Sequence, residues 1–304
     1  HDESDAIVTL DGGKFTATKN GDYKFWAEYG TLSTFDKNLD DNGLFTIKAI
    51  SVAVPAVAAD PQKEKTSFVH RAFLTQYTGT GCGYCPAMIK IIRELFADKT
   101  IPEKAVHAAV HSFNSADPAY ISAPKVNNYP YLTVDQVQGF SHSQPSSVLK
   151  SLVEASIASS AKAGISVNPK YYAEEGVLVV TVSVKAAAEG LFNVGAWLLE
   201  DGIYGMQEDY NNIGDSSYNT HENCVRIADS KYKGTWFGHS LGSLNAGDAA
   251  TKTFVMKVKK DWKLENLHLA VFASYGEKDG DKLVYSVCNA VDAPIDAPTP
   301  FEYK

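Results

Sequence analysis

The feature that most constrains this chain is a pair of cysteines two residues apart, followed directly by proline: Cys82-Gly83-Tyr84-Cys85-Pro86. The segment before the pair is rich in apolar and β-branched residues, as expected of a strand: FVHRAFLTQYT. The segment after it has apolar side chains at helical spacing: CPAMIKIIRELFADK. The pattern therefore predicts a strand, a Gly-rich loop and a helix that begins at the second cysteine.

This placement predicts thiol chemistry. The unpaired backbone N–H groups and the dipole at a helix N-terminus favour a thiolate at Cys82. Cys85 follows one turn later on the same side, so it can close a disulfide with Cys82 or resolve a mixed disulfide formed on it. We therefore expect Cys82 to be the more exposed, attacking thiol of the pair and Cys85 the resolving one, in a loop that Tyr84 and Pro86 complete.

Two other interpretations of the pair remain open. One is a static disulfide. The other is a zinc site, which needs a second pair of ligands. The only candidates for that second pair are His221 and Cys224, which lie in another predicted domain. We expect no metal and no cofactor.

The segments after the helix complete an α/β unit. Two further strands are predicted in KAVHAAVHSF and NNYPYLTVDQVQGF, and a closing helix in QPSSVLKSLVEASIASSAKA. The order strand, helix, strand, strand, helix predicts a thioredoxin-like domain over residues 64–163. In such folds a cis proline faces the cysteine pair. We therefore expect a cis Tyr129-Pro130 bond and assign substrate binding to these two residues.

Both flanking regions are β-rich. Residues 1–58 alternate polar and apolar side chains, which predicts a partial Ig-like β domain. Residues 164–304 contain several β-branched runs, which predict an antiparallel β-sandwich, and Asp279-Gly280 between the last two runs is a hairpin signal. The long segment 208–246 is rich in Gly, Asn and Ser, so we expect it to be irregular. The expected fold class is α/β plus all-β, with the thioredoxin-like domain between two β regions.

Composition restricts the function classes. The chain has 304 residues, 44% of them hydrophobic, and a formal net charge of −8. An acidic chain without a basic face is a poor nucleic-acid binder, so we expect no nucleic-acid partner. No apolar run reaches the length of about 18 residues that a membrane-spanning helix needs. Because no signal peptide is present at His1, we expect the mature form of an exported protein.

The sequence resembles the outer membrane protein 28-related family of Bacteroides-type bacteria. The likeness is carried by FLTQYTGTGCGYCPAMIKII and continues through VHAAVHSF, NNYPYLTVDQ, YNTHENCVR and KLVYSVCNA, over about residues 66–304. The resemblance implies an envelope lipoprotein of the periplasm, outer membrane or cell surface, held to the membrane by a lipid anchor. It also implies that Ig-like domains precede a thioredoxin-like domain.

One position departs from that family. An acidic residue usually stands six positions before the first cysteine, where a buried carboxylate assists proton transfer to the resolving thiol. This chain has Gln76 there, which can form hydrogen bonds but cannot titrate. We therefore do not expect this chain to turn over efficiently as a disulfide reductase.

Several other residues have alternative interpretations. His111 shares a strand face with His107 and could perturb Cys82, although a hydrogen-bonded structural histidine is the commoner role. Cys224 and Cys288 could form a disulfide within the sandwich, or they could remain separate buried thiols.

The residues support two functions. The first is thiol–disulfide exchange on cysteine-containing envelope proteins or peptides, carried out by Cys82 and Cys85. The second is a non-catalytic binding or structural protein that retains the fold, which Gln76 and the flanking β regions favour. Fold alone does not decide between them.

Overall fold

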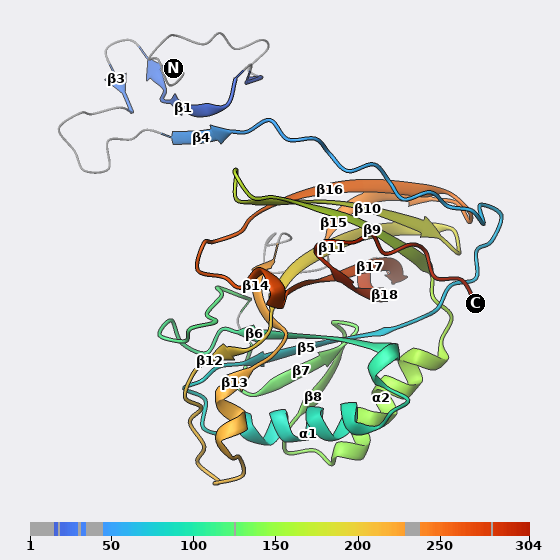
Figure 1. The fold of residues 1–304 in the computed structure, drawn as a ribbon. Coiled ribbons are helices and arrows are strands. Elements are labelled where there is room, and N and C mark those ends of the chain that lie inside the picture. The colour runs from blue at the N-terminus through green and yellow to red at the C-terminus, as the bar shows by residue number, and fades with distance from the viewer. Residues whose placement is uncertain are drawn as a thin grey trace. The chain divides into compact units, whose positions relative to one another are not determined.

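Figure 1 shows a computed structural model of the chain. It describes residues 15–17, 19–29, 32–34, 45–124, 126–228, 238–280 and 282–304. The chain divides into two compact units, His1–Ala53 and Val54–Lys304.

The first unit contains two short antiparallel pairs in its described residues. Strand β1 (Gly21–Phe25) pairs with β4 (Phe45–Ala49), and β2 (Glu28–Tyr29) pairs with β3 (Leu32–Ser33). The Tyr23 side chain is buried against the ring of Phe15, with ring centroids 4.7 Å apart. Much of the predicted Ig-like segment 1–58 lies outside the described residues, so the Ig-like assignment remains a prediction.

The first half of the second unit carries its two long helices. The elements follow in the order β5 (Ala72–Thr78), α1 (Cys85–Ala97), η1 (Pro102–Lys104), β6 (Ala105–His111), β7 (Tyr131–Val134), β8 (Gln138–Ser141) and α2 (Ser146–Ala158). Strand β5 runs parallel to β6 and antiparallel to β7, which is antiparallel to β8. Side chains of α1 and α2, among them Met88, Leu95 and Leu149, share one apolar core with Leu74 and Leu132 of the sheet.

The second half is almost entirely strands. They are β9 (Ala163–Tyr172), β10 (Val177–Ala186), β11 (Gly190–Glu200), β12 (Ile203–Tyr204), β13 (Thr220–His221), β14 (Cys224–Ala228), β15 (His239–Leu244), β16 (Ala249–Lys257), β17 (Leu267–Asp279) and β18 (Lys282–Pro294), with short turns η2 (Ser216–Asn219) and η3 (Leu264–Asn266). Strands β17 and β18 form the predicted hairpin, in which Gly280 has a φ of +60°. Strands β14 and β15 lie within the segment predicted to be irregular.

Hydrogen bonds join nine strands from both halves of this unit into one sheet. Eight follow the order β18-β17-β11-β14-β6-β5-β7-β8, and β15 also pairs with β11. The sheet folds back on itself where β14 meets β6 through a single residue pair, Cys224 with Ala109. The two halves then pack face to face. The rings of Phe73 on β5 and Phe272 on β17 stack with centroids 4.9 Å apart, and both side chains are fully buried. Burying one such ring contributes roughly 1.5–3 kcal/mol.

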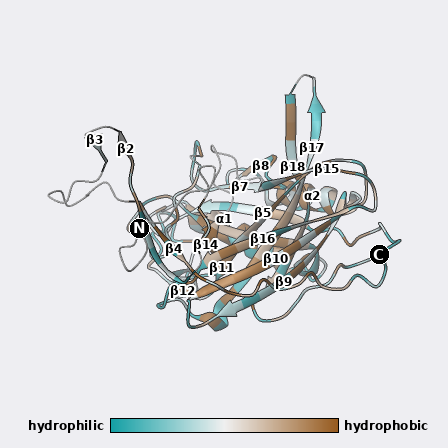
Figure 2. Ribbon diagram, turned by 90° about the horizontal axis from the view of Figure 1, so that it is seen from above, coloured by the Kyte–Doolittle hydropathy of each residue, from teal (hydrophilic) through white to brown (hydrophobic). Residues whose placement is uncertain are grey.

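A separate three-stranded sheet, β16-β10-β9, packs on the opposite face of β11, β17 and β18 through a second apolar core. Figure 2 shows brown, apolar ribbon along β10, β11 and β16. The β-rich fold expected from the sequence is therefore present. Residues 64–163 and 164–304 share the nine-stranded sheet and one compact unit. The boundary between them at residue 163 remains a sequence-based prediction.

Residues 55–63, which precede β5, pack on the outer face of β10. The Thr181 hydroxyl donates to the Pro55 carbonyl at 2.7 Å. Lys185, whose side chain is only 3% exposed, donates from Nζ to Asp60 Oδ2 at 2.9 Å and to the Lys63 carbonyl at 2.6 Å. Strand β10 is consequently buried along its whole length.

His268 on β17 lies between two carboxylates. Its Nδ1 is 2.8 Å from Asp292 Oδ1, and its Nε2 is 3.5 Å from Asp201 Oδ1. Burial by itself lowers the pKa of His268. Hydrogen bonds to Asp201 and Asp292 outweigh the burial and raise the pKa from its ordinary 6.5 to about 9.

We expect His268 to make stability fall at alkaline pH. The folded chain binds the His268 proton more tightly than the unfolded chain, so the stabilisation is complete below about pH 6.5 and is lost as pH rises through about 9. Because the His268 side chain is 16% exposed, we expect its protonation to contribute about 2 kcal/mol to the free energy of unfolding. Urea denaturation should show His268→Gln less stable than wild type near pH 6 and nearly equal to it near pH 10. An equal deficit at both pH values would contradict this role.

Candidate functional site

The two cysteines lie where β5 passes into α1, and they are joined as a disulfide with their Cα atoms 5.3 Å apart. Two consecutive turns shape the loop. The Cys82 N–H donates to the Gly79 carbonyl, and the Cys85 N–H donates to the Cys82 carbonyl, both at 3.0 Å. Helix α1 begins at Cys85 with Tyr84 as its N-cap, and Pro86 is in its first turn. The sulfur pair therefore sits at the positive end of the helix dipole.

Both cysteines of the disulfide are buried. Cys82 is 3% exposed and Cys85 is fully buried, so the order of exposure is as predicted but neither sulfur lies on the open surface. A segment distant in sequence packs on the backbone of this loop. Residues 205–214, here called the strap, run across the loop from the connection between β12 and β13.

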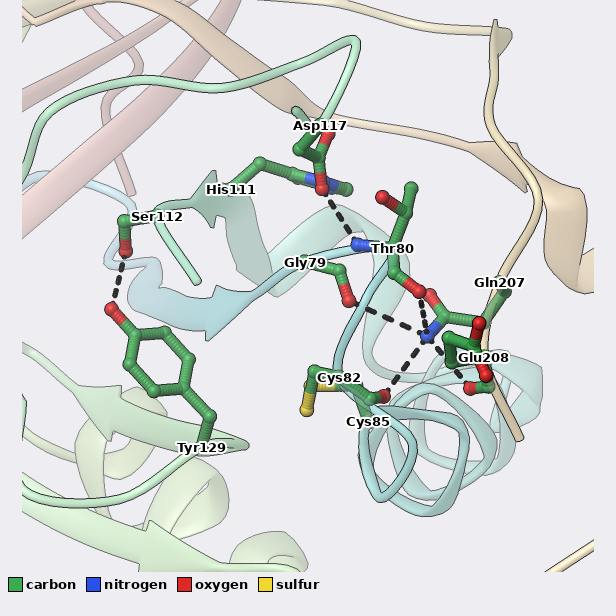
Figure 3. The surroundings of a disulfide bond; sticks show 10 residues. All are labelled: Gly79, Thr80, Cys82, Cys85, His111, Ser112, Asp117, Tyr129, Gln207 and Glu208. Carbon is green, nitrogen blue, oxygen red and sulfur yellow. Dashed lines mark hydrogen bonds and ion pairs between the residues drawn. A yellow bond between two sulfur atoms is a disulfide. The ribbon is translucent and has the colours of Figure 1, made fainter. Parts of the chain in front are cut away.

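The strap is hydrogen-bonded to the backbone of the disulfide loop (Figure 3). The Gln207 side-chain amide lies 3.0 Å from the Cys82 carbonyl, 3.2 Å from the Thr80 carbonyl and 3.4 Å from the Gly79 carbonyl. The Glu208 N–H donates to the Thr80 carbonyl at 2.8 Å. These bonds occupy acceptors that an incoming peptide could otherwise use.

Aromatic side chains of the strap and the disulfide loop also pack together. The Tyr210 N–H donates to the Gly83 carbonyl, and the Tyr210 ring lies so close to Gly83 that a Cβ there would be 2.5 Å from it. A side chain at position 83 would therefore require the Tyr210 ring to move. Tyr84 packs edge-on against Tyr210 at 5.4 Å and stacks on His142 at 6.0 Å, and its side chain is 49% exposed.

A buried carboxylate holds the loop from its other end. Asp117 Oδ2 accepts from the Thr80 N–H at 2.6 Å and lies 2.9 Å from His111 Nδ1. Burial raises the pKa of Asp117, but the bond to His111 and the backbone donors lower it to about 2. His111 is 1% exposed, and its Nε2 is 3.6 Å from Cys224 Sγ. Both ring nitrogens of His111 therefore have partners, and an influence of His111 on Cys82 remains a prediction.

The Tyr129-Pro130 bond is cis, as predicted. The Tyr129 hydroxyl pairs with Ser112 Oγ at 2.8 Å, and its ring packs edge-on against Phe113. In Figure 3 the disulfide lies between Tyr129 on one side and Gln207 on the other. Substrate binding at Tyr129 and Pro130 remains a prediction.

Gln76 lies in the interior, 3% exposed, and its Oε1 is 3.1 Å from His107 Nε2. Burial lowers the pKa of His107 to about 4. The nearest polar contact of Gln76 is therefore an imidazole that stays neutral near pH 7.

The possible disulfide between Cys224 and Cys288 is absent: both thiols are free and buried. Burial raises the pKa of Cys288 to about 12 and that of Cys224 well above its ordinary value. Neither is a nucleophile in this state. Among the described residues, no group of three or more His, Cys, Asp or Glu could hold a metal ion.

Sequence reasoning missed Gln207 and Asp117. Neither belongs to a motif with the cysteines, and both act on the loop through backbone groups. The Asp-Pro pair at 117–118 signals only a turn.

The sequence profile described as outer membrane protein Omp28 matches residues 117–295, which is more than half of the chain. The chain belongs to the Omp28 family. The matched region begins after the disulfide loop, so the match does not include Cys82 or Cys85. The Omp28 family points to the cell envelope or outer membrane. No helix in the described residues is long and apolar enough to cross a membrane.

Among solved structures, this Omp28 family chain is similar to HBP35 of Porphyromonas gingivalis, with a TM-score of 0.60 and 17% identity over 76% of this chain and 77% of that chain. At this identity the likeness shows the fold alone. A protein from Agrobacterium tumefaciens, with a TM-score of 0.45 and 11% identity over 77% of this chain and 97% of that chain, is too distant to support a conclusion. The same holds for a domain of RIM from Drosophila, with a TM-score of 0.25 and 12% identity over 47% of this chain and 98% of that chain. No curated protein matches the chain.

Proposed function

We propose that this Omp28 family protein is a thiol–disulfide exchange protein of the cell envelope, built on a thioredoxin-like segment. The observation that carries the proposal is the Cys82–Cys85 disulfide at the start of α1. Support also comes from the sheet order β6-β5-β7-β8, with β5 and β6 parallel, β7 and β8 antiparallel, and α1 and α2 packed against the sheet.

The exchange runs through two thiols. In the reduced protein, the Cys82 thiolate attacks a partner disulfide, forms a mixed disulfide and releases one partner thiolate. Cys85 then attacks Cys82 Sγ, which re-forms the Cys82–Cys85 disulfide and releases the second partner thiolate. The partner gains two electrons and the protein loses two. Reversal of the same steps oxidises a partner dithiol.

A second candidate is a binding or structural envelope protein with a static disulfide. The burial of Cys82 favours it, because a protein-sized partner has no direct access to a sulfur on a residue that is only 3% exposed. The absence of a carboxylate at Gln76 also favours it. The two candidates differ in whether the folded protein exchanges its disulfide.

Exchange requires the strap to open, so weakening the strap should speed reduction. Gln207→Ala removes an amide that lies close to three loop carbonyls, and we expect it to raise the opening population about tenfold. The rate of reduction by dithiothreitol, followed by alkylation and mass spectrometry, should rise by the same factor. Asn211→Ala, an exposed strap position, is the matched control and should react like wild type.

A static disulfide gives a different result. If dithiothreitol reduces both proteins only at the rate of global unfolding, the folded protein does not exchange and the binding-protein candidate is correct.

A further inference from the structure

The segment that enters and forms the strap alternates between buried and exposed positions. Gly205 and Gln207 are buried against the disulfide loop, whereas the residues on either side of them are exposed. Three of the exposed side chains are large and apolar: Tyr204 is 68% exposed, Met206 76% and Tyr210 64%. They are the three most exposed large hydrophobic side chains in the part of the Val54–Lys304 unit that the structure describes.

Backbone hydrogen bonds hold these side chains in place. The Gly205 N–H donates to the Asn219 carbonyl, and the Gln207 N–H donates to Asn219 Oδ1, both at 2.9 Å. The N–H groups of Glu208 and Tyr210 donate to carbonyls of the disulfide loop. A partner that binds here therefore meets a surface whose backbone is already fixed, which lowers the ordering cost of association.

Tyr84 of the disulfide loop extends this surface, because its half-exposed ring packs edge-on against Tyr210 at 5.4 Å. Tyrosine and methionine are enriched in protein interfaces relative to the rest of the surface, and exposed apolar side chains that gather in one place mark interaction sites. We call the set Tyr84, Tyr204, Met206, Glu208 and Tyr210 the outer row. Its composition indicates a surface for another molecule.

The charge of the segment decides the sign of that molecule. Residues 204–219 contain no Lys or Arg and three acidic residues, Glu208, Asp209 and Asp215. Arg93 of α1 contacts this segment, but its guanidinium group is bound to the Ser217 hydroxyl at 2.9 Å. Carboxylates attract a cation and repel an anion, and the face of a tyrosine ring also attracts a cation. The aromatic and the acidic side chains therefore favour the same charge.

We propose that the outer row binds a cationic, extended segment of a partner polypeptide. Side chains of Arg or Lys lie over the rings of Tyr204 and Tyr210 and pair with the Glu208 carboxylate. Arg fits better than Lys, because its planar guanidinium group stacks on an aromatic ring and can bind a carboxylate through two hydrogen bonds. Binding uses the closed strap of the oxidised chain, so the inference holds for either candidate function.

A short cysteine-free peptide of alternating Arg and Ser residues is a suitable probe. Titrated into the oxidised full chain by calorimetry, it should bind with a Kd of roughly 10–1,000 μM. Peptides with Lys, Gln or Glu in place of Arg should bind progressively more weakly in that order. The affinity for the Arg peptide should fall as the salt concentration rises, because salt screens exposed charges.

Two positions separate the ring from the charge. Tyr204→Leu keeps an apolar side chain but removes the ring, and it should weaken binding of the Arg peptide about two- to fivefold, whereas Tyr204→Phe should bind like wild type. Glu208→Gln should weaken binding by a similar factor. Glu265→Gln is the matched control, since Glu265 is exposed in η3 and the same charge is lost outside the outer row. It should leave the affinity unchanged.

Several results would overturn the proposal. They are the absence of saturable binding of the Arg peptide, equal binding of the Arg and Glu peptides, equal affinities of Tyr204→Leu and Tyr204→Phe, and equal losses in Glu208→Gln and Glu265→Gln. Tighter binding of cellohexaose, a neutral sugar that can stack on aromatic rings, would assign the outer row to carbohydrate instead. Because the peptides contain no cysteine and the disulfide stays oxidised, none of these results bears on thiol exchange.

Discussion

Replacing Lys185 by methionine should lower the free energy of unfolding of the Val54–Lys304 unit by about 3 kcal/mol. The Lys185 ammonium group is fully enclosed by Asp60 Oδ2, the Gln62 and Lys63 carbonyls and the Tyr303 hydroxyl. Removing it leaves the Asp60 carboxylate, only 15% exposed, without its cation and leaves two carbonyls without their donor. Loss of one partner from a buried ion pair is strongly destabilising for this reason.

The measurement is urea denaturation near neutral pH. Lys257→Met is the matched control, since Lys257 is exposed on the neighbouring strand β16, and it should change stability by less than about 0.5 kcal/mol. Residues around Asp60 should also become sensitive to proteolysis in Lys185→Met, because the segment loses its attachment to β10. If Lys185→Met is as stable as the control, the Lys185 ammonium group makes no net contribution to the free energy of unfolding.

The Cys85→Ser variant should accumulate mixed disulfides through Cys82, whereas Cys82→Ser should accumulate none. Cys85 is fully buried and Cys82 retains the little exposure that the pair has, so only Cys82 can meet a partner sulfur. Without the Cys85 thiol, the bond between Cys82 and the partner has no internal nucleophile to cleave it. The difference is all-or-none and is read on non-reducing gels of envelope extracts, with identification by mass spectrometry.

The strap provides the internal check. Combining Gln207→Ala with Cys85→Ser should increase the yield of mixed disulfides, since the strap limits access to Cys82. A Cys288→Ser variant, which alters a buried thiol distant from the loop in sequence, should trap nothing. Equal trapping by Cys85→Ser and Cys82→Ser would rule out the assigned roles.

Local sequence signals predicted the elements that depend on local periodicity and turn chemistry. Helical spacing after Cys85 predicted α1, and Asp279-Gly280 predicted the β17–β18 hairpin. The strand runs of the C-terminal half correspond to β10, β11, β16, β17 and β18. Strand β15 was missed because Gly and Ser interrupt its apolar residues, and β14, CVRIA, was missed because it is only five residues long and lies within a stretch rich in Gly, Asn and Ser.

The sequence by itself determined where the disulfide loop lies, that a helix begins at its second cysteine, and that most of the remaining chain forms strands. These properties arise from neighbours within a few residues. Only the tertiary structure decided that Cys82 is buried and that the amide of Gln207, 128 residues from Gly79 along the chain, contacts the carbonyls of its loop. It also decided that Lys185 is enclosed and that Cys224 and Cys288 stay apart. Such contacts pair single polar groups across distant elements and leave no periodic pattern in the sequence.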